Sequence, residues 1–244
     1  MIRAADLVAL RSSFATCSGP GLPKTLAADF ARVLGVSDLA ISFIGTSDHV
    51  LLRSSSGDAR SMHEWEFSLG TGPGFDAAVT GTATSAGTAA SPNNPWPRLS
   101  AKARAIGYEA IAGVPWRVQG TTFATLTLQD RHGSITSETL ADAERVGDEL
   151  ASLMVSSLGQ SRFLDLPADH DTFHQATGMV MKQMGIEAGS AVDVLRAHAW
   201  SHDRLLMEVA TEVVGRALTF RLEIPPHQLD DEVPVVPDVR GLFH

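Results

Sequence analysis

The segment from Thr172 to Val214 constrains the fold most, because it reads as three short amphipathic helices separated by two sharp breaks. Apolar residues recur at helical spacing in three runs, 173–184, 191–199 and 205–214. Gly185 ends the first run, and a polar group at 201–203 ends the second. Helices of about ten to fifteen residues are marginal alone in water. The three runs must therefore bury their apolar stripes together, which predicts a small helical module.

Many positions in this segment match one known pattern at fixed spacing and without gaps. They are Gln175, Ala176, Thr177, Gly178, Gly185, Ala191, Leu195, Arg196, Ala199, Leu206, Val209 and Ala210. In these residues the segment closely resembles the ANTAR domain, the RNA-binding antiterminator module of bacterial transcription regulators. The resemblance implies an ANTAR-like domain at 161–221. It also implies binding to tandem hairpins in the leader of a nascent transcript, which prevents a terminator from forming.

The resemblance further implies an RNA contact surface on the module. Small side chains let an RNA backbone approach a helix closely, which is the role expected of Ala176, Gly178, Ala191 and Ala199. Basic side chains bind phosphates or stack on bases, as expected of Lys182, Arg196 and Arg204. Trp200 is expected to stack on a loop base. The alanines have a second interpretation, because small residues are also needed where three short helices cross.

Charge argues against loose binding of this chain to any polyanion. The net charge is −9, and the segment 156–221 carries six basic and eight acidic residues. At positions where the ANTAR pattern commonly has basic or polar residues, this chain has Thr177, Trp200 and Asp203, and Val192 replaces an aromatic. RNA contact would therefore depend on a local basic patch. The alternative is a ligand-sensing dimer whose helical module binds a protein partner instead of RNA.

The residues before this module predict an α+β domain with an antiparallel sheet and helices segregated to one side. Helices are expected at 1–14 and 22–34, and a β-hairpin at 38–52 with its turn at 45–48. Two more strands are expected at 110–116 and 123–128. Between the hairpins lies an irregular middle, in which a glycine-rich turn at 70–74 leads into a short helix.

Two pieces of this domain resemble the GAF sensor domain. One is the run Leu69-Gly-Thr-Gly-Pro-Gly74 before a short helix and Gly81, and the other is Val114-Pro-Trp116 followed by the strand 123–128. The resemblance implies a GAF-like sensor domain at 1–150, with a small-molecule pocket between sheet and helices. The expected walls are aromatic: Phe43, Trp65, Phe67, Phe75, Trp96, Tyr108 and Trp116. Each of these residues has an equally good interpretation as core.

The segment Ser137 to Leu164 predicts a long helix with apolar residues on one face. The apolar face consists of Leu140, Ala143, Val146, Leu150 and Leu153. The helix is longer than one sheet face requires, which predicts a coupling helix at 137–164 that pairs with a second copy in a homodimer. The alternative is that the helix packs wholly on its own domain.

No arrangement of residues in the sequence supports catalysis. There is no G-x-S-x-G nucleophile motif, and the glycines at 70, 72 and 74 lack the rest of a nucleotide-binding fingerprint. Two histidine pairs, 170/174 and 198/202, each supply two ligands, where a zinc site needs three or four. We therefore expect no enzyme activity, no metal and no cofactor.

Targeting signals and membrane spans are also missing from the sequence. It has no apolar run near 18 residues and no cleavable signal pattern, and the single cysteine, Cys17, excludes an internal disulfide. The segment 222–244 is acidic and proline-rich, which indicates a flexible tail. We expect a cytoplasmic, homodimeric and signal-responsive RNA-binding antiterminator.

Overall fold

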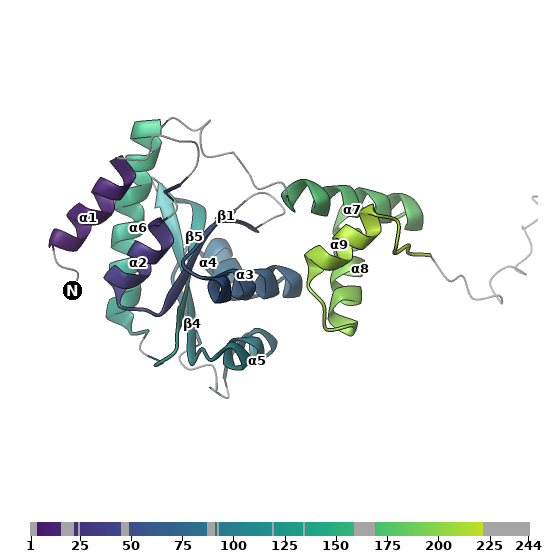
Figure 1. The fold of residues 1–244 in the computed structure, drawn as a ribbon, viewed down its shortest axis with the longest axis horizontal. Helices are drawn as coiled ribbons and strands as arrows, with labels where there is room; N and C mark the ends of the chain where they lie inside the picture. Colours follow the sequence, from purple (N-terminus) through teal and green to yellow (C-terminus); the bar gives the residue numbers. More distant parts are fainter. Residues whose placement is uncertain are drawn as a thin grey trace, which may run out of the picture.

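The structure is a computed structural model of the full chain, and it describes most of the sequence up to residue 221. The described ranges are 4–15, 22–23, 25–44, 49–86, 91, 93–118, 120–133, 135–158 and 169–221. They form an α+β N-terminal unit and a C-terminal group of helices, joined through a segment outside the described residues (Figure 1). Cys17 and the expected tail at 222–244 also lie outside the described residues.

An antiparallel five-stranded sheet forms the centre of the N-terminal unit, in the order β2-β1-β5-β4-β3. The strands are β1 (Asp38–Ile44), β2 (His49–Ser54), β3 (Thr84–Ser85), β4 (Ala110–Val118) and β5 (Thr121–Asp130). The two expected hairpins, β1–β2 and β4–β5, are confirmed, and β1 joins them by pairing with β5. The class is therefore α+β, as predicted. The helices were expected on one side of the sheet only, but they cover both of its faces, and the short edge strand β3 was not expected.

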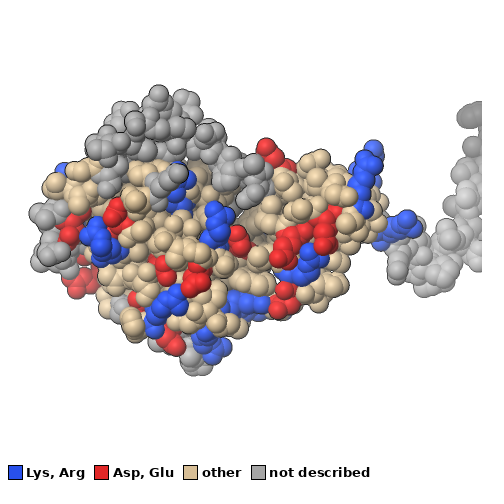
Figure 2. All heavy atoms as spheres, in the orientation of Figure 1, with Lys and Arg blue, Asp and Glu red and all other residues tan. Residues whose placement is uncertain are grey.

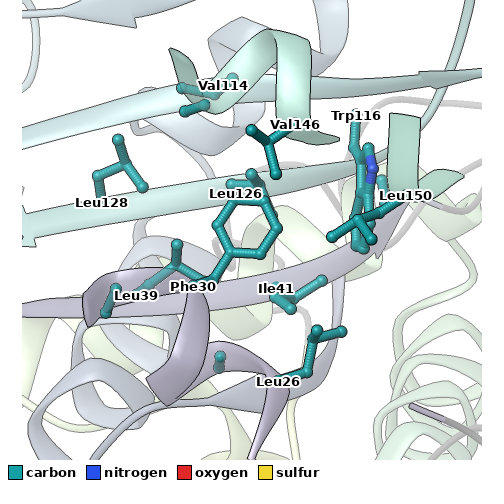
Figure 3. Packing of buried hydrophobic residues seen from close by; sticks show 14 of the residues in the cluster. Leu26, Phe30, Leu39, Ile41, Val114, Trp116, Leu126, Leu128, Val146 and Leu150 are labelled. Carbon is teal, nitrogen blue, oxygen red and sulfur yellow. The ribbon is translucent and has the colours of Figure 1, made fainter. Parts of the chain in front are cut away.

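One face of the sheet packs against α2 (Leu26–Leu34) and α6 (Ser137–Leu158), with α1 (Ala4–Ala15) beside α2 (Figure 1). This face is apolar because alternate residues of each strand point to it. The core shown in Figure 3 contains Leu26, Phe30, Leu39, Ile41, Val114, Trp116, Leu126, Leu128, Val146 and Leu150. Burying one large apolar side chain of this kind contributes about 1.5–3 kcal/mol. This layer is therefore the main source of stability in the N-terminal unit.

This core uses the face of α6 that was expected to pair two copies of the chain. Ala143, Val146 and Leu150 are buried against the sheet, and the Trp116 Nε1–H donates to the carbonyl of Gly147. These three side chains of the expected dimer face are therefore not available to pair two copies, because they are buried within the protomer. The side chain of Leu153 lies outside the described residues. The helix is described only to Leu158, and the rest of the expected range to 164 lies outside the described residues. A homodimer through another surface stays a prediction.

The other sheet face packs against α3 (Gly57–Leu69) and α4 (Pro73–Thr80), and α5 (Pro97–Ile106) packs on α3 and β4. The Ser56 hydroxyl caps α3 by accepting from the Ala59 amide at 3.1 Å, and Gly70 ends it at φ 65°. The expected turn at 70–74 and the short helix after it are confirmed. However, α3 and α5 occupy a region predicted to be irregular.

The three expected C-terminal helices are present as α7 (Asp169–Met184), α8 (Ala188–Ser201) and α9 (Leu206–Val214). Gly185 at φ 67° and Asp203 at φ 51° mark the two predicted breaks. Their shared core contains Phe173, Ala176, Val180, Ala191, Leu195, Ala199, Leu206, Val209, Ala210 and Val213, and it also includes Phe67 of α3. We call α7–α9 the module. Across the described ranges, we find no helix with the length and apolar character needed to cross a membrane.

Candidate functional site

The sheet face beneath α3 and α4 is buried and yet polar. On β5, Thr125, Thr127 and Gln129 alternate with the apolar residues of the opposite face, and each is at most 3% exposed. With Ser42 of β1 and two residues of α3 they form a group that we call the polar layer. The polar layer consists of Ser42, His63, Glu66, Thr125, Thr127 and Gln129, all buried. Burial of polar groups costs free energy unless they are hydrogen-bonded, so their partners decide what the layer can do.

Part of the polar layer is fixed by hydrogen bonds inside the protein. The Ser42 hydroxyl lies 2.9 Å from His63 Nδ1. Glu66 Oε1 accepts from the amides of Gly74 at 2.6 Å and Phe75 at 3.4 Å, which are the first amides of α4, and Thr127 donates to Oε2 at 3.4 Å. A carboxylate suits this place because the N-terminus of a helix carries partial positive charge. Glu66 therefore joins α3, α4 and β5.

The rest of the polar layer has unused hydrogen-bonding capacity. Thr125 Oγ1 and both side-chain amide atoms of Gln129 are buried, and they have no hydrogen-bond partner among the described residues. Leaving a buried polar group unsatisfied costs about 1–3 kcal/mol. These atoms offer donors and acceptors to a small polar molecule or to ordered water. The polar layer is therefore the candidate ligand site of the N-terminal unit.

Glu66 is the titratable group of the polar layer. Burial raises its pKa to about 7, against the lowering effect of the bonds from Gly74, Phe75 and Thr127. The carboxyl group thus changes between its neutral and charged forms near neutral pH. A group of this kind in a ligand site responds both to pH and to the charge of a bound molecule.

Glycines allow α4 to come close enough to the sheet to reach Glu66. A methyl group on Gly113 of β4 would overlap the backbone carbonyl of Pro73, and one on Gly74 would lie 2.9 Å from Thr127 Oγ1. A methyl group on Gly72 would meet the Glu66 carboxylate. The expected turn at 70–74 therefore has a physical role, which is to seat the first amides of α4 on the polar layer.

The aromatic residues expected to line one pocket lie in different parts of the protein. Trp116 belongs to the apolar core on the far face of the sheet, and Trp96 and Tyr108 pack beside Met62, with Trp65 against them. Phe67 and Phe75 pack against the module, and Phe43 is half-buried on β1. The structure does not bring these residues together around one site. The polar layer was missed, although the alternation of Thr125, Thr127 and Gln129 along a strand was its signal in the sequence.

Three of the residues expected to contact RNA are buried inside the module. Ala176, Ala191 and Ala199 are at most 1% exposed and pack where the three helices meet. This arrangement corrects their expected role, since it leaves them no surface for RNA and favours the helix-crossing interpretation. Gly178 and Lys182 are exposed on α7.

The remaining expected RNA residues are engaged within the protein. Arg204 pairs with Glu212 at 2.8 Å and with Glu208 at 3.4 Å. The guanidinium of Arg196 lies over the ring of Phe67, 6.0 Å from its centroid, and Trp200 lies beneath a guanidinium of α5. Figure 2 shows acidic and basic side chains interspersed over the visible face of the module. The local basic patch on which RNA contact would depend is therefore not supported by these contacts, since Arg196 and Arg204 are each engaged elsewhere.

The histidine pair at the end of α8 stacks, with His198 and His202 ring centroids 4.2 Å apart. Burial, His202 and Arg204 lower the pKa of His198. Within the described part of the chain there is no group of three or more His, Cys, Asp or Glu side chains that could hold a metal ion. The side chain of His170 lies outside the described residues.

The N-terminal part of the fold is similar to solved GAF domains. The GAF domain of a phosphoenolpyruvate-protein phosphotransferase from Coxiella burnetii is 14% identical over 64% of this chain and 95% of that domain, with a TM-score of 0.48. The corresponding domain from Acinetobacter is 12% identical over 62% and 91%, with a TM-score of 0.47. A free methionine-R-sulfoxide reductase from Neisseria meningitidis is 16% identical over 64% and 85%, with a TM-score of 0.42.

At these identities and TM-scores, the likeness says nothing of ligand, activity or partner. No protein-family model and no curated protein matches the chain.

Proposed function

We propose that this chain is a cytoplasmic, homodimeric and signal-responsive regulator of transcription. Its GAF-like N-terminal unit takes up a small polar molecule at the polar layer, and its ANTAR-like module binds hairpins in nascent leader RNA and prevents termination. One observation carries the link between the two. Glu66 belongs to the polar layer, and the next residue of α3, Phe67, belongs to the core of the module.

The sensing half of the proposal is supported by the chemistry of the polar layer. A layer that only stabilised the fold would be expected to satisfy its buried groups, and Thr125 and Gln129 are left without partners among the described residues. The ligand that fits is small and both donates and accepts hydrogen bonds. Isothermal titration with candidate metabolites, comparing the parent with Gln129→Leu, would test this half.

The RNA-binding half is supported by the sequence pattern of the module together with the exposure of Lys182, Gly178 and part of Trp200. The test is to cross-link the protein to RNA in its own cells and sequence what is bound. A hairpin RNA recovered in this way then serves as the probe for the two predictions that follow.

Replacing Lys182 with alanine should weaken binding of this hairpin RNA and lower the salt dependence of its affinity. If the ammonium contacts one phosphate, the slope of log affinity against log salt falls by about one. Arg60→Ala is the matched control, because it removes the same charge from α3 at a side chain paired with Glu64. Fluorescence anisotropy at several salt concentrations measures the slope. An unchanged slope in the Lys182 variant would count against phosphate contact on α7.

Replacing Gly178 with alanine should stabilise α7 and weaken RNA binding. Glycine inside a helix costs about 0.5–1 kcal/mol relative to alanine, and a methyl group at this position meets nothing within 4 Å. If an RNA backbone approaches this helix, the added methyl group obstructs it. Gly189→Ala on α8 is the control, because it too meets no atom within 4 Å. Thermal unfolding measures the stability of the variant, and fluorescence anisotropy measures its affinity for the hairpin RNA. An affinity that rises or stays unchanged would mean that RNA does not contact α7 at Gly178.

A second candidate function has one observation in its favour. Arg204 is neutralised by two glutamates, and the module carries more acidic than basic side chains, so a protein partner suits this surface as well as RNA does. Salt distinguishes the two. Affinity for RNA falls steeply with salt through counterion release, whereas a largely apolar protein interface depends on salt only weakly.

A further inference from the structure

The N-terminal unit and the module share an interface built by the last turn of α3 and by α5. Phe67 packs edge to face against Phe173 of α7, with ring centroids 5.0 Å apart. Phe67 is 8% exposed, and Phe173 is 3% exposed. Among the described residues, Phe67 is the only buried side chain that the N-terminal unit adds to the core of the module, whereas the core beneath α6 contains many. The contact is therefore suited to opening while both parts stay folded.

The interface also completes a helix of the module. The first amides of a helix lack partners within it, and a side-chain oxygen at the N-cap normally satisfies one of them. The N-cap of α9 is Leu205, which has no such oxygen. Instead, the Leu206 amide donates to the hydroxyl of Ser68 at 2.8 Å, from a residue 138 positions earlier in the chain. The start of α9 thus depends on α3.

Two side chains expected to bind RNA lie in this interface. The guanidinium of Arg196 is packed against Gly70, where a Cβ would lie 2.8 Å from Arg196 Cζ. Arg98 of α5 lies over the ring of Trp200, 4.3 Å from its centroid. Beside them, Lys102 of α5 pairs with Asp203 at 2.5 Å. The N-terminal unit therefore contacts the module at two of the residues expected to bind RNA.

We infer that this arrangement is a closed state, in which the α3–α5 surface and RNA compete for Arg196 and Trp200 of the module. The inference rests on the proposed function, and it names the regulation of the RNA-binding surface. Opening the interface uncovers both side chains and removes the Ser68 cap from α9. RNA binds the open state, and each molecule of bound RNA therefore holds the module away from α3.

The route from the ligand site to this interface is one turn of helix. Glu66 holds the first amides of α4, Phe67 and Ser68 contact the module, and Gly70 accommodates Arg196. A molecule that enters the polar layer and displaces the Glu66 carboxylate breaks its bonds to α4 and so frees this turn to move. The same turn carries the contacts to the module, so its movement changes the equilibrium between the closed and the open state.

The exposed charge pair allows a test by charge reversal. Lys102→Glu places two acids together and opens the interface, and Asp203→Lys does the same with two cations. The double variant restores attraction and closes it. Losing an exposed ion pair and adding repulsion is expected to raise the open population by up to about tenfold. Hydrogen exchange at the Leu206 amide reports opening without any RNA, since this amide is protected by Ser68.

RNA binding by the same three variants tests masking. Lys102→Glu should bind the hairpin RNA recovered from cells up to about tenfold more tightly than the parent, although the substitution adds negative charge. The double variant should return to the parental affinity. Faster exchange with unchanged or weaker binding in Lys102→Glu overturns the inference and leaves the proposed function standing. No RNA binding by any variant overturns both. Parental exchange in both single variants shows that the contact does not open in this way and overturns the inference.

A glycine pair gives a second test that changes no charge. Gly70→Ala strains a residue at φ 65° and pushes on the guanidinium of Arg196, whereas Gly35→Ala imposes the same strain at φ 68° with nothing within 4 Å. Both variants should lose similar global stability. Only Gly70→Ala should speed exchange at Leu206 and tighten RNA binding. Equal behaviour of the two variants would argue against Arg196 as a masked residue.

Discussion

Replacing Gly113 with alanine should lower the free energy of unfolding of the N-terminal unit by about 3 kcal/mol, at the upper end of what overpacking normally costs. The reason is that α4 begins almost in contact with β4. The added methyl group would overlap the Pro73 carbonyl and would lie 2.8 Å from the Gly74 nitrogen. Both are backbone atoms, so no side-chain rotation relieves the overlap and the start of α4 must move away from the sheet.

Urea unfolding followed by far-UV circular dichroism measures this effect. Gly57→Ala is the matched control, because its methyl group meets nothing within 4 Å and its backbone has no left-handed strain. If the Gly113 variant fails to fold while the Gly57 control variant folds, the expectation is also met. If both variants unfold at the same urea concentration, α4 does not press on β4 as described. A shifted α4 should also release Glu66, because its strongest bond comes from Gly74 at 2.6 Å.

The sequence was informative wherever one face of an element is apolar and the other meets water. The module helices and α6 have this pattern. The two hairpins were also predicted, from runs of strand-forming residues between turn signals, although helices cover both faces of their sheet. The direction in which an apolar stripe faces was not determined by the pattern. Val146 and Leu150 would look the same in a dimer seam as in the core beneath Trp116, and only the folded structure distinguishes the two.

The sequence pattern did not predict α3, and the reason is physical. This helix is covered on several sides, with Met62 against α5, Glu66 on the sheet and Phe67 on the module, so it has no single apolar stripe. Its buried residues include polar ones, which makes the segment resemble a loop. The polar layer and the interface with the module both depend on α3. The candidate site was therefore missed for the same reason as the helix that builds it.

Replacing Glu66 with glutamine should remove a change in stability with pH that the parent protein shows near neutrality. The pKa of Glu66 is raised by burial from 4.5 to about 7 in the folded state. Between these values the folded protein keeps a proton that the unfolded chain has lost, so the free energy of unfolding falls as pH rises from about 4.5 to about 7. The shift corresponds to roughly 3 kcal/mol over this window. The glutamine side chain does not titrate, yet its carbonyl can still accept from the α4 amides.

The measurement is urea unfolding of both proteins at several pH values. The deciding quantity is the difference between their free energies of unfolding at each pH. All other titrating groups are common to both, so they cancel in it. The difference should move in favour of Glu66→Gln by roughly 3 kcal/mol from about pH 4.5 to about pH 7.5 and stay level above that. Glu64→Gln makes the same chemical change on the same helix, at a side chain that is 30% exposed, and should show a much smaller movement. A level difference for Glu66→Gln would mean that its carboxyl group is solvated in the folded protein. The polar layer would then be open to water, and ligand entry would need no movement of α3.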